Sequence, residues 1–146
     1  MARYVTKVRT SCSPDEVFAY MADLRNFAEW DPGVRQVAQV EGEGGGPGAV
    51  FDVTVRTRRE QTLRYRTAVF DPPHELLVVA KTKALTSEDR ITVGSDGRGS
   101  IVTYDAVLRF NGPLRIGGAV LNFVFKRVGD RASAGLCRAI EGERLS

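Results

Sequence analysis

Alternation of apolar and polar residues runs through most of the chain and predicts β-strands. Residues 2–10 begin the pattern, with Tyr4, Thr6 and Val8 on one side and charged residues between them. The same alternation predicts strands at residues 34–41, 49–57, 61–70, 75–83, 87–94 and 100–110. The six later strands follow one another with only short turns between them. We therefore expect an antiparallel meander.

Two short helices are predicted between the first strand and the meander. Ser13-Pro14-Asp15-Glu16 is typical of a helix start, because serine caps the first N–H groups and proline is tolerated in the first turn. A second short helix is expected within residues 23–30. Asp31-Pro32-Gly33 should end it, since proline and glycine disfavour helix continuation.

The last long segment, Pro113 to Arg144, is predicted to be a single helix. Apolar or small residues recur at the three-to-four spacing of one helical face, at Gly117, Leu121, Val124, Val128, Ala132, Leu136 and Ile140. Residues 116–125 are apolar on nearly all sides, which indicates a cavity wall and a lip at its mouth. Glycines such as Gly129 and Gly135 remove side-chain volume, so we expect them to leave room for a guest or to permit a bend.

Length and composition indicate one globular domain, residues 1–146. No apolar run reaches the roughly 18 residues needed to cross a bilayer, and no signal peptide is expected. Cys12 and Cys137 have neither metal-site nor redox spacing, so we expect reduced thiols in a cytoplasmic protein. The net charge of +3 is mild and does not require a nucleic-acid partner.

Several chemistries lack the residues that they need. Gly44-x-Gly46 precedes a strand rather than a helix, so it cannot hold a dinucleotide pyrophosphate at a helix N-terminus. His74 is the only histidine and lies in a Pro-Pro turn, which argues against a zinc hydrolase or a histidine-activated hydrolase. We expect no metal and no cofactor.

The element order, with residues 13–18 (SPDEVF) and 23–32 (DLRNFAEWDP), resembles the START-like (SRPBCC) superfamily. The resemblance is to its bacterial polyketide cyclase/dehydrase group, which is related to coenzyme Q-binding proteins. It implies an α+β helix-grip fold, in which a curved seven-stranded antiparallel sheet wraps around the C-terminal helix and an apolar cavity. Members bind lipids, quinones, polyketides or hormones, and some catalyse cyclisation or dehydration; fold alone does not choose among these.

Polar side chains expected on the inner face of the sheet are the best candidates for chemistry. Tyr65, Thr67, Asp89 and Tyr104 share faces with aliphatic residues, and small-molecule sites combine apolar walls with a few polar groups. Asp89 is the catalytic candidate, because an inward carboxylate must pair or take a raised pKa. The alternative for both tyrosines is core packing, and a register error of one residue would place Asp89 outside.

The predicted ligand-binding residues combine inner-face strand positions with one face of the long helix. They are Trp30, Phe51, Val53, Tyr65, Thr67, Ile91, Tyr104, Leu121, Val124, Phe125 and Val128. For Trp30 the alternative is that it seals the junction between a short helix and the sheet.

Four arginines are expected on the outer face of two neighbouring strands: Arg56, Arg58, Arg64 and Arg66. Like charges opposite one another repel, so an anionic membrane or an acidic partner could compensate them; the alternative is a solvated face that maintains solubility. No aromatic platform interleaves these arginines, as binding of single-stranded nucleic acid would prefer.

Three functional hypotheses follow. The first is a carrier or sensor that binds a small hydrophobic ligand, such as a lipid, a quinone or a polyketide-like molecule. The second is a cyclase or dehydratase that uses the same cavity without metal or nucleotide. The third is an interaction protein acting through the arginine face. The sequence leaves open whether the chain is a monomer or a homodimer.

Overall fold

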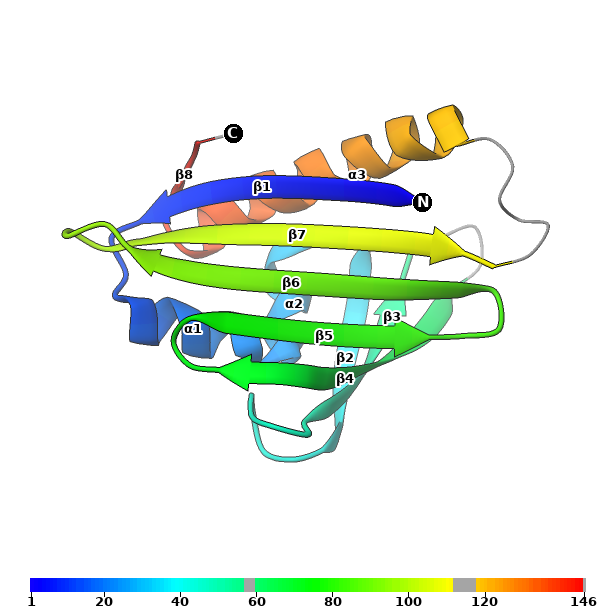
Figure 1. The fold of residues 1–146 in the computed structure, drawn as a ribbon, viewed down its shortest axis with the longest axis horizontal. Helices are drawn as coiled ribbons and strands as arrows, with labels where there is room; N and C mark the ends of the chain where they lie inside the picture. Colours follow the sequence, from blue (N-terminus) through cyan, green and yellow to red (C-terminus); the bar gives the residue numbers. More distant parts are fainter. Residues whose placement is uncertain (57–59, 112–117, 146) are drawn as a thin grey trace.

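The computed structural model describes residues 1–56, 60–111 and 118–145, with the side chains of residues 118–122 outside that description. The elements, in chain order, are β1 (Ala2–Thr10), α1 (Pro14–Ala22), the 3₁₀ turn η1 (Leu24–Asn26), α2 (Phe27–Trp30), β2 (Val34–Glu41), β3 (Val50–Val55), β4 (Gln61–Asp71), β5 (Glu75–Lys81), β6 (Leu85–Ser95), β7 (Ser100–Phe110), α3 (Gly118–Ala139) and β8 (Glu143–Arg144) (Figure 1).

The strands form one antiparallel sheet with the order β2-β3-β4-β5-β6-β7-β1-β8. The predicted meander is confirmed from β2 to β7, and β1 joins its far end by pairing with β7 from Ala2↔Leu108 to Thr10↔Ser100. In the described part of the chain the sheet has eight strands rather than the expected seven. The addition is the two-residue β8, which pairs Arg144 with Val8 of β1.

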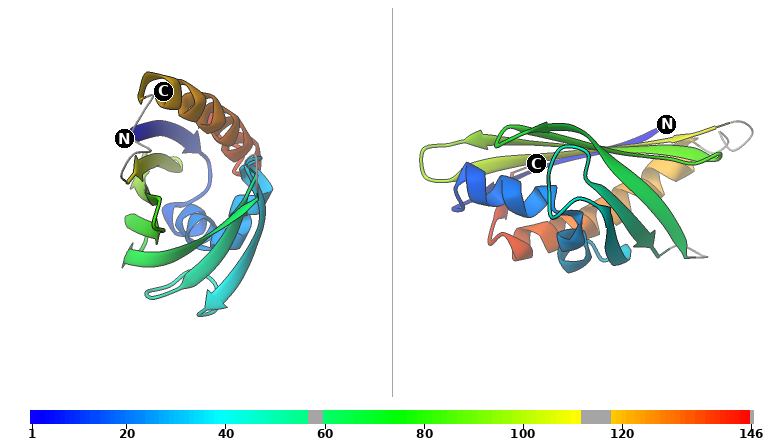
Figure 2. Two further views of the ribbon diagram at one scale, coloured as in Figure 1. Left: turned by 90° about the vertical axis from the view of Figure 1, so that its right-hand side faces the viewer. Right: turned by 90° about the horizontal axis from the view of Figure 1, so that it is seen from below.

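The sheet is strongly curved, and the helices α1, α2 and α3 lie on its concave side (Figure 2). Strand residues that point to this side are buried, as the BeBeBeBeB pattern along β1 demonstrates. The most deeply buried large side chains include Met21, Trp30, Leu76 and Leu136, which come from both the helices and the sheet. The predicted helix-grip arrangement is confirmed, and the core lies between the sheet and the helices.

The N-terminal helical pair forms as its capping residues predict. The Ser13 side chain accepts a hydrogen bond from the backbone N–H of Glu16 at 3.2 Å. Asp23 then separates α1 from η1, and its carboxylate accepts from the backbone N–H of Arg25 at 3.1 Å. These caps fix where the chain turns, and thereby bring α2 and the residues after it beside the sheet.

The long helix ends earlier than predicted. Its last helical residue is Ala139, and the expectation of helix to Arg144 is wrong. Glu141 takes φ +51°, and the N–H of Gly142 donates to the carbonyl of Cys137 at 2.7 Å. This is a Schellman-type end, in which a left-handed residue reverses the chain. The predicted start, residues 113–117, lies outside the described residues.

Gly129 and Gly135 of α3 allow close packing rather than leaving empty volume, contrary to the expectation that they make room for a guest. A Cβ on Gly129 would lie 2.5 Å from the Tyr4 ring, and a Cβ on Gly135 would lie 1.7 Å from the carbonyl oxygen of Trp30. The helix therefore approaches β1 and the end of α2 more closely than any side chain would permit.

Candidate functional site

A cavity of about 310 Å³ lies between the inner face of the sheet, the end of α2 and the part of α3 nearest its start. Its lining is mainly apolar, with five residues that carry polar side-chain atoms. It consists of Phe27, Asp31, Val34, Val53, Val55, Leu63, Tyr65, Ser87, Asp89, Tyr104, Ala106, Leu108, Val124, Phe125 and Val128. This volume and composition are typical of a small-molecule site.

Adjacent strands supply most of the polar groups. The Tyr104 hydroxyl on β7 donates to Oδ2 of Asp89 on β6 at 2.9 Å. Two residues earlier on β6, Ser87 shares a hydrogen bond of 2.7 Å with the Tyr65 hydroxyl from β4. Because side chains two residues apart point to the same face of a strand, these four groups all line the cavity.

The second carboxylate comes from the segment that leaves α2. Asp31 lies directly after Trp30, and its Oδ1 accepts a hydrogen bond from the backbone N–H of Gly33 at 2.8 Å. The turn that ends the helix thus holds the Asp31 side chain in place at the cavity. Two acids from distant parts of the sequence, Asp31 and Asp89, therefore line one cavity.

Burial favours the neutral form of both acids, and at Asp89 the negative charge of Asp31 adds to this effect. Burial is the main cause that raises the pKa of Asp89, and the Tyr104 hydrogen bond acts against it. With the smaller raising effects of the negative charges of Asp31 and Asp105, the pKa reaches about 7. Burial likewise raises the pKa of Asp31. Desolvation and the nearby Asp89 raise the pKa values of Tyr65 and Tyr104, so both phenols stay protonated near neutral pH. Asp89 can therefore exchange a proton near neutral pH.

The predicted site residues separate into three groups. Val53, Tyr65, Asp89, Tyr104, Val124, Phe125 and Val128 line the cavity. Trp30, Phe51, Thr67 and Ile91 are buried in the core and are not among the lining residues. The Leu121 side chain lies outside the described residues.

The alternation that predicted the inward residues identifies a face but not a position along the strand. Trp30 illustrates the difference: its ring packs against Phe27 and against Tyr104, with ring centroids 4.8 and 5.5 Å apart, behind the cavity wall. This is the sealing role given above as its alternative. Ile91, two residues beyond Asp89 on β6, is fully buried.

Sequence reasoning missed Asp31 and Ser87 as site residues. Asp31 was interpreted only as part of a helix-ending turn, and an acid in that position normally satisfies backbone groups near the surface. The signal that could have identified Asp31 is its position directly after Trp30. The chain leaves the core at this point, so the side chain of the next residue can still lie beside the core. Ser87 falls on the same face as Asp89 by period-two spacing, and this signal was present in the strand pattern.

Residues in the N-terminal half of α3 line the cavity. Val124 and Val128 line the cavity, yet they are 50 % and 45 % exposed. Farther along the same face, Ala132 and Leu136 are buried against the core. Among the described side chains of α3, the apolar face is thus covered in its second half and half-exposed at Val124 and Val128.

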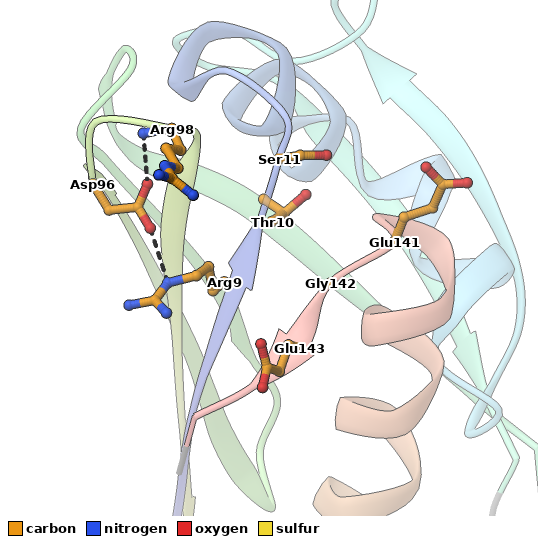
Figure 3. A pocket seen from close by; sticks show the side chains of 8 residues that line it. All are labelled: Arg9, Thr10, Ser11, Asp96, Arg98, Glu141, Gly142 and Glu143. Atoms are coloured by element: carbon orange, nitrogen blue, oxygen red, sulfur yellow. Dashed lines mark hydrogen bonds and ion pairs between the residues drawn. The ribbon is translucent and has the colours of Figure 1, made fainter.

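A separate hollow of about 330 Å³ lies at the C-terminal end of β1 (Figure 3). Side chains from β1, the β6–β7 hairpin and the C-terminal segment surround it, among them Arg9, Asp96 and Arg98. Arg9 forms an ion pair with Asp96 at 2.9 Å, and the backbone N–H of Arg98 donates to the same carboxylate at 3.2 Å. Arg9 and Asp96 neutralise each other, and the described residues that line this hollow include no aliphatic or aromatic side chain, unlike those of the cavity.

The outer arginine face differs from the expectation of opposed like charges. The register places Arg64 opposite Asp52, and the two form an ion pair at 2.8 Å, while Arg66 lies opposite Val50. Arg56 is exposed beyond the end of β3, and Arg58 lies outside the described residues. The repulsion that suggested an anionic partner is therefore absent at Arg64. Contact with an anionic membrane stays a prediction from the sequence.

The described residues contain no group of three or more histidine, cysteine or acidic side chains that could hold a metal ion. Cys12 and Cys137 are free, half-buried thiols. None of the helices in the described ranges is both long and apolar enough to span a membrane.

Solved structures with the same fold cover nearly all of the chain. A START superfamily protein from Mycobacterium smegmatis superposes with a TM-score of 0.74 at 14 % identity, over 97 % of this chain and 98 % of that one. One half of the di-domain ARO/CYC StfQ from the steffimycin biosynthetic pathway superposes with a TM-score of 0.71 at 13 % identity, covering 96 % of this chain and 50 % of that one. Ginseng major latex-like protein 151 from Panax ginseng has a TM-score of 0.70 at 9 % identity, over 95 % and 97 % of the two chains.

At these identities the structures establish the fold, and comparison with curated proteins finds no match. The sequence profile of one family, described as polyketide cyclase / dehydrase and lipid transport, matches residues 1–141. That match includes β1, the helical pair, the whole meander and α3. The chain belongs to the polyketide cyclase/dehydrase and lipid transport family.

Proposed function

We propose that the protein binds a small hydrophobic ligand, of the lipid, quinone or polyketide-like kind, in the cavity between the sheet and α3, and acts as its carrier or sensor. The observation that carries the proposal is the cavity of about 310 Å³, whose walls are mostly aliphatic and aromatic. Burial of apolar ligand surface there would supply about 25 cal/mol per Å². Entry would take place beside the half-exposed Val124 and Val128.

Native mass spectrometry of protein purified from its source, together with calorimetric titration with neutral 1-naphthalenemethanol, tests this proposal. In the variant Val128→Phe the phenylalanine ring, which is larger than the valine side chain, should occupy the cavity and weaken binding of the probe about tenfold. The free energy of unfolding should change little, because Val128 is half-exposed. Ala134→Phe places the same ring at an exposed position of α3 and serves as the control. Unchanged affinity in a folded Val128→Phe protein would contradict the proposal.

Catalysis in the same cavity is the second candidate, and the Asp89–Tyr104 pair favours it. A carboxyl group with a pKa of about 7 can act as an acid or a base near neutral pH. The Tyr65 hydroxyl, which can accept from Ser87, can then donate to a carbonyl oxygen and orient it. An enzyme would lose turnover in Asp89→Asn, because the amide keeps the size of the side chain but cannot exchange the proton. A carrier would convert no polyketide-like carbonyl compound, with or without the substitution.

A further inference from the structure

Two acids and no base occur among the described residues that line the cavity. Asp31 and Asp89 are both present, whereas lysine, arginine and histidine are absent from the lining. Asp89 is only 6 % exposed, and its single hydrogen bond, from Tyr104, engages Oδ2. Asp31 accepts only from the N–H of Gly33, through Oδ1. In the described part of the chain, one oxygen of each carboxylate therefore has no protein donor.

A buried carboxylate without a positive partner is unfavourable in its charged form. Here the charge of Asp31 also disfavours the charged form of Asp89, whose pKa it raises. A bound cation would offset both effects, while a bound carboxylate or sulfonate would add a third negative charge to the same space. The tyrosines do not alter this balance, because Tyr65 and Tyr104 remain neutral.

Aromatic rings in the lining independently favour the same kind of ligand. Phe27, Tyr65, Tyr104 and Phe125 all line the cavity. The faces of aromatic rings attract ammonium groups, and this attraction grows when the cation is removed from water. Carboxylates together with aromatic rings are the combination that recognises an organic ammonium group, whereas a hydrated inorganic ion would gain nothing from the aliphatic walls.

We propose that the ligand carries a protonated amine on an apolar body, and that Asp31 and Asp89 bind the ammonium group while the aliphatic walls hold the rest. This inference rests on the proposed function, since it concerns the same cavity. It excludes free fatty acids and other anionic lipids as the preferred ligands.

Three probes that share one ring system separate this inference from plain hydrophobic binding. They are 1-naphthylmethylamine, neutral 1-naphthalenemethanol and anionic 1-naphthoic acid, each titrated calorimetrically into the whole protein. The amine should bind about tenfold or more tightly than the alcohol, because a hydrogen bond to a charged group exceeds a neutral one by about 1.4 kcal/mol. The acid should bind most weakly. Lowering the pH from about 8 to about 5.5 should weaken only the amine, as Asp89 takes up its proton.

Isosteric variants identify the residues responsible. Asp89→Asn and Asp31→Asn keep the oxygen that accepts from Tyr104 or Gly33, so both should fold. Each should reduce amine affinity about tenfold and leave the alcohol unchanged. Glu88→Gln is the matched control, because Glu88 precedes Asp89 on β6 but pairs with Arg109 on the outer face, and it should alter no affinity.

The outcomes distinguish the two proposals. Alcohol binding as tight as or tighter than amine binding, or amine binding that both asparagine variants retain, would overturn the amine inference and leave the proposed function intact. Failure of all three probes to bind, with no guest in the native mass spectrum, would overturn the proposed function and this inference together.

Discussion

Replacing Asp89 by asparagine is expected to stabilise the protein at alkaline pH. Asp89 is buried beside Tyr104 and repelled by Asp31, and burial is the main cause that raises its pKa from 3.8 to about 7. The charged form is therefore less favourable in the folded chain than in the unfolded chain. Asparagine keeps the size of the side chain and an oxygen that accepts from the Tyr104 hydroxyl, but carries no charge.

The size of the effect follows from the two pKa values. Below pH 3.8 both states are protonated and the penalty is absent. Between 3.8 and about 7 the folded state keeps a proton that the unfolded state has lost, so wild-type stability falls as pH rises. Above about pH 7 Asp89 is charged in both states. The total loss in the free energy of unfolding is then the difference of about 3.2 between the two pKa values multiplied by about 1.36 kcal/mol, or about 4 kcal/mol.

Urea denaturation of wild type and Asp89→Asn, from about pH 4 to about pH 8.5, measures this difference. The two proteins should be within about 1 kcal/mol of each other at the acidic end. The variant should become progressively more stable than wild type toward the alkaline end, by up to about 4 kcal/mol. Glu88→Gln should reproduce the wild-type pH dependence. A difference that does not depend on pH, or a variant less stable than wild type at pH 8.5, would refute the assignment of Asp89 as a buried, unpaired acid.

Two further predictions concern the packing of α3. Gly135→Ala should destabilise the protein by about 3 kcal/mol or more in urea denaturation, because the new Cβ would meet the Trp30 carbonyl oxygen at 1.7 Å. On helix propensity alone the same change would be favourable by about 1 kcal/mol. Ala134→Gly, at an exposed position of α3, measures that contribution separately. A Gly135→Ala protein more stable than wild type would disprove the close approach of α3 to Trp30. Leu136→Ala, at a side chain 1 % exposed, should cost about 2–5 kcal/mol, and a loss below about 1 kcal/mol would show that α3 does not pack there.

The sequence predicted the elements of the fold well because period-two alternation and capping residues are local signals. Ser13 capped its helix as expected, and every strand of the meander formed within a few residues of its predicted limits. The end of α3 was missed because Glu141, rather than a glycine, adopts the left-handed conformation. Glycine at that position would have provided the usual signal.

The site was predictable only in part, because it depends on where distant segments meet. The inward orientation of Asp89, Tyr65 and Tyr104 followed from alternation. The contribution of Asp31 did not, since it depends on how the turn after α2 meets the sheet. The roles of Gly129 and Gly135 were also hidden, because a sequence cannot distinguish a glycine that leaves space from one that another element approaches.

The pairing of β1 with β7 has a consequence for how the chain assembles. The register joins Ala2 to Leu108 and Thr10 to Ser100, whereas every pairing within the meander, from β2–β3 to β6–β7, joins strands that follow one another in sequence. At a synthesis rate of about 5–20 residues per second, β1 waits about 5–20 s on the ribosome before its partner exists. During that interval Tyr4, Thr6 and Val8, all buried in the finished sheet, have no inner surface to cover them. Non-local pairing of this kind slows folding. The meander from β2 to β7 can therefore form first, and β1 then pairs with β7 as a late step.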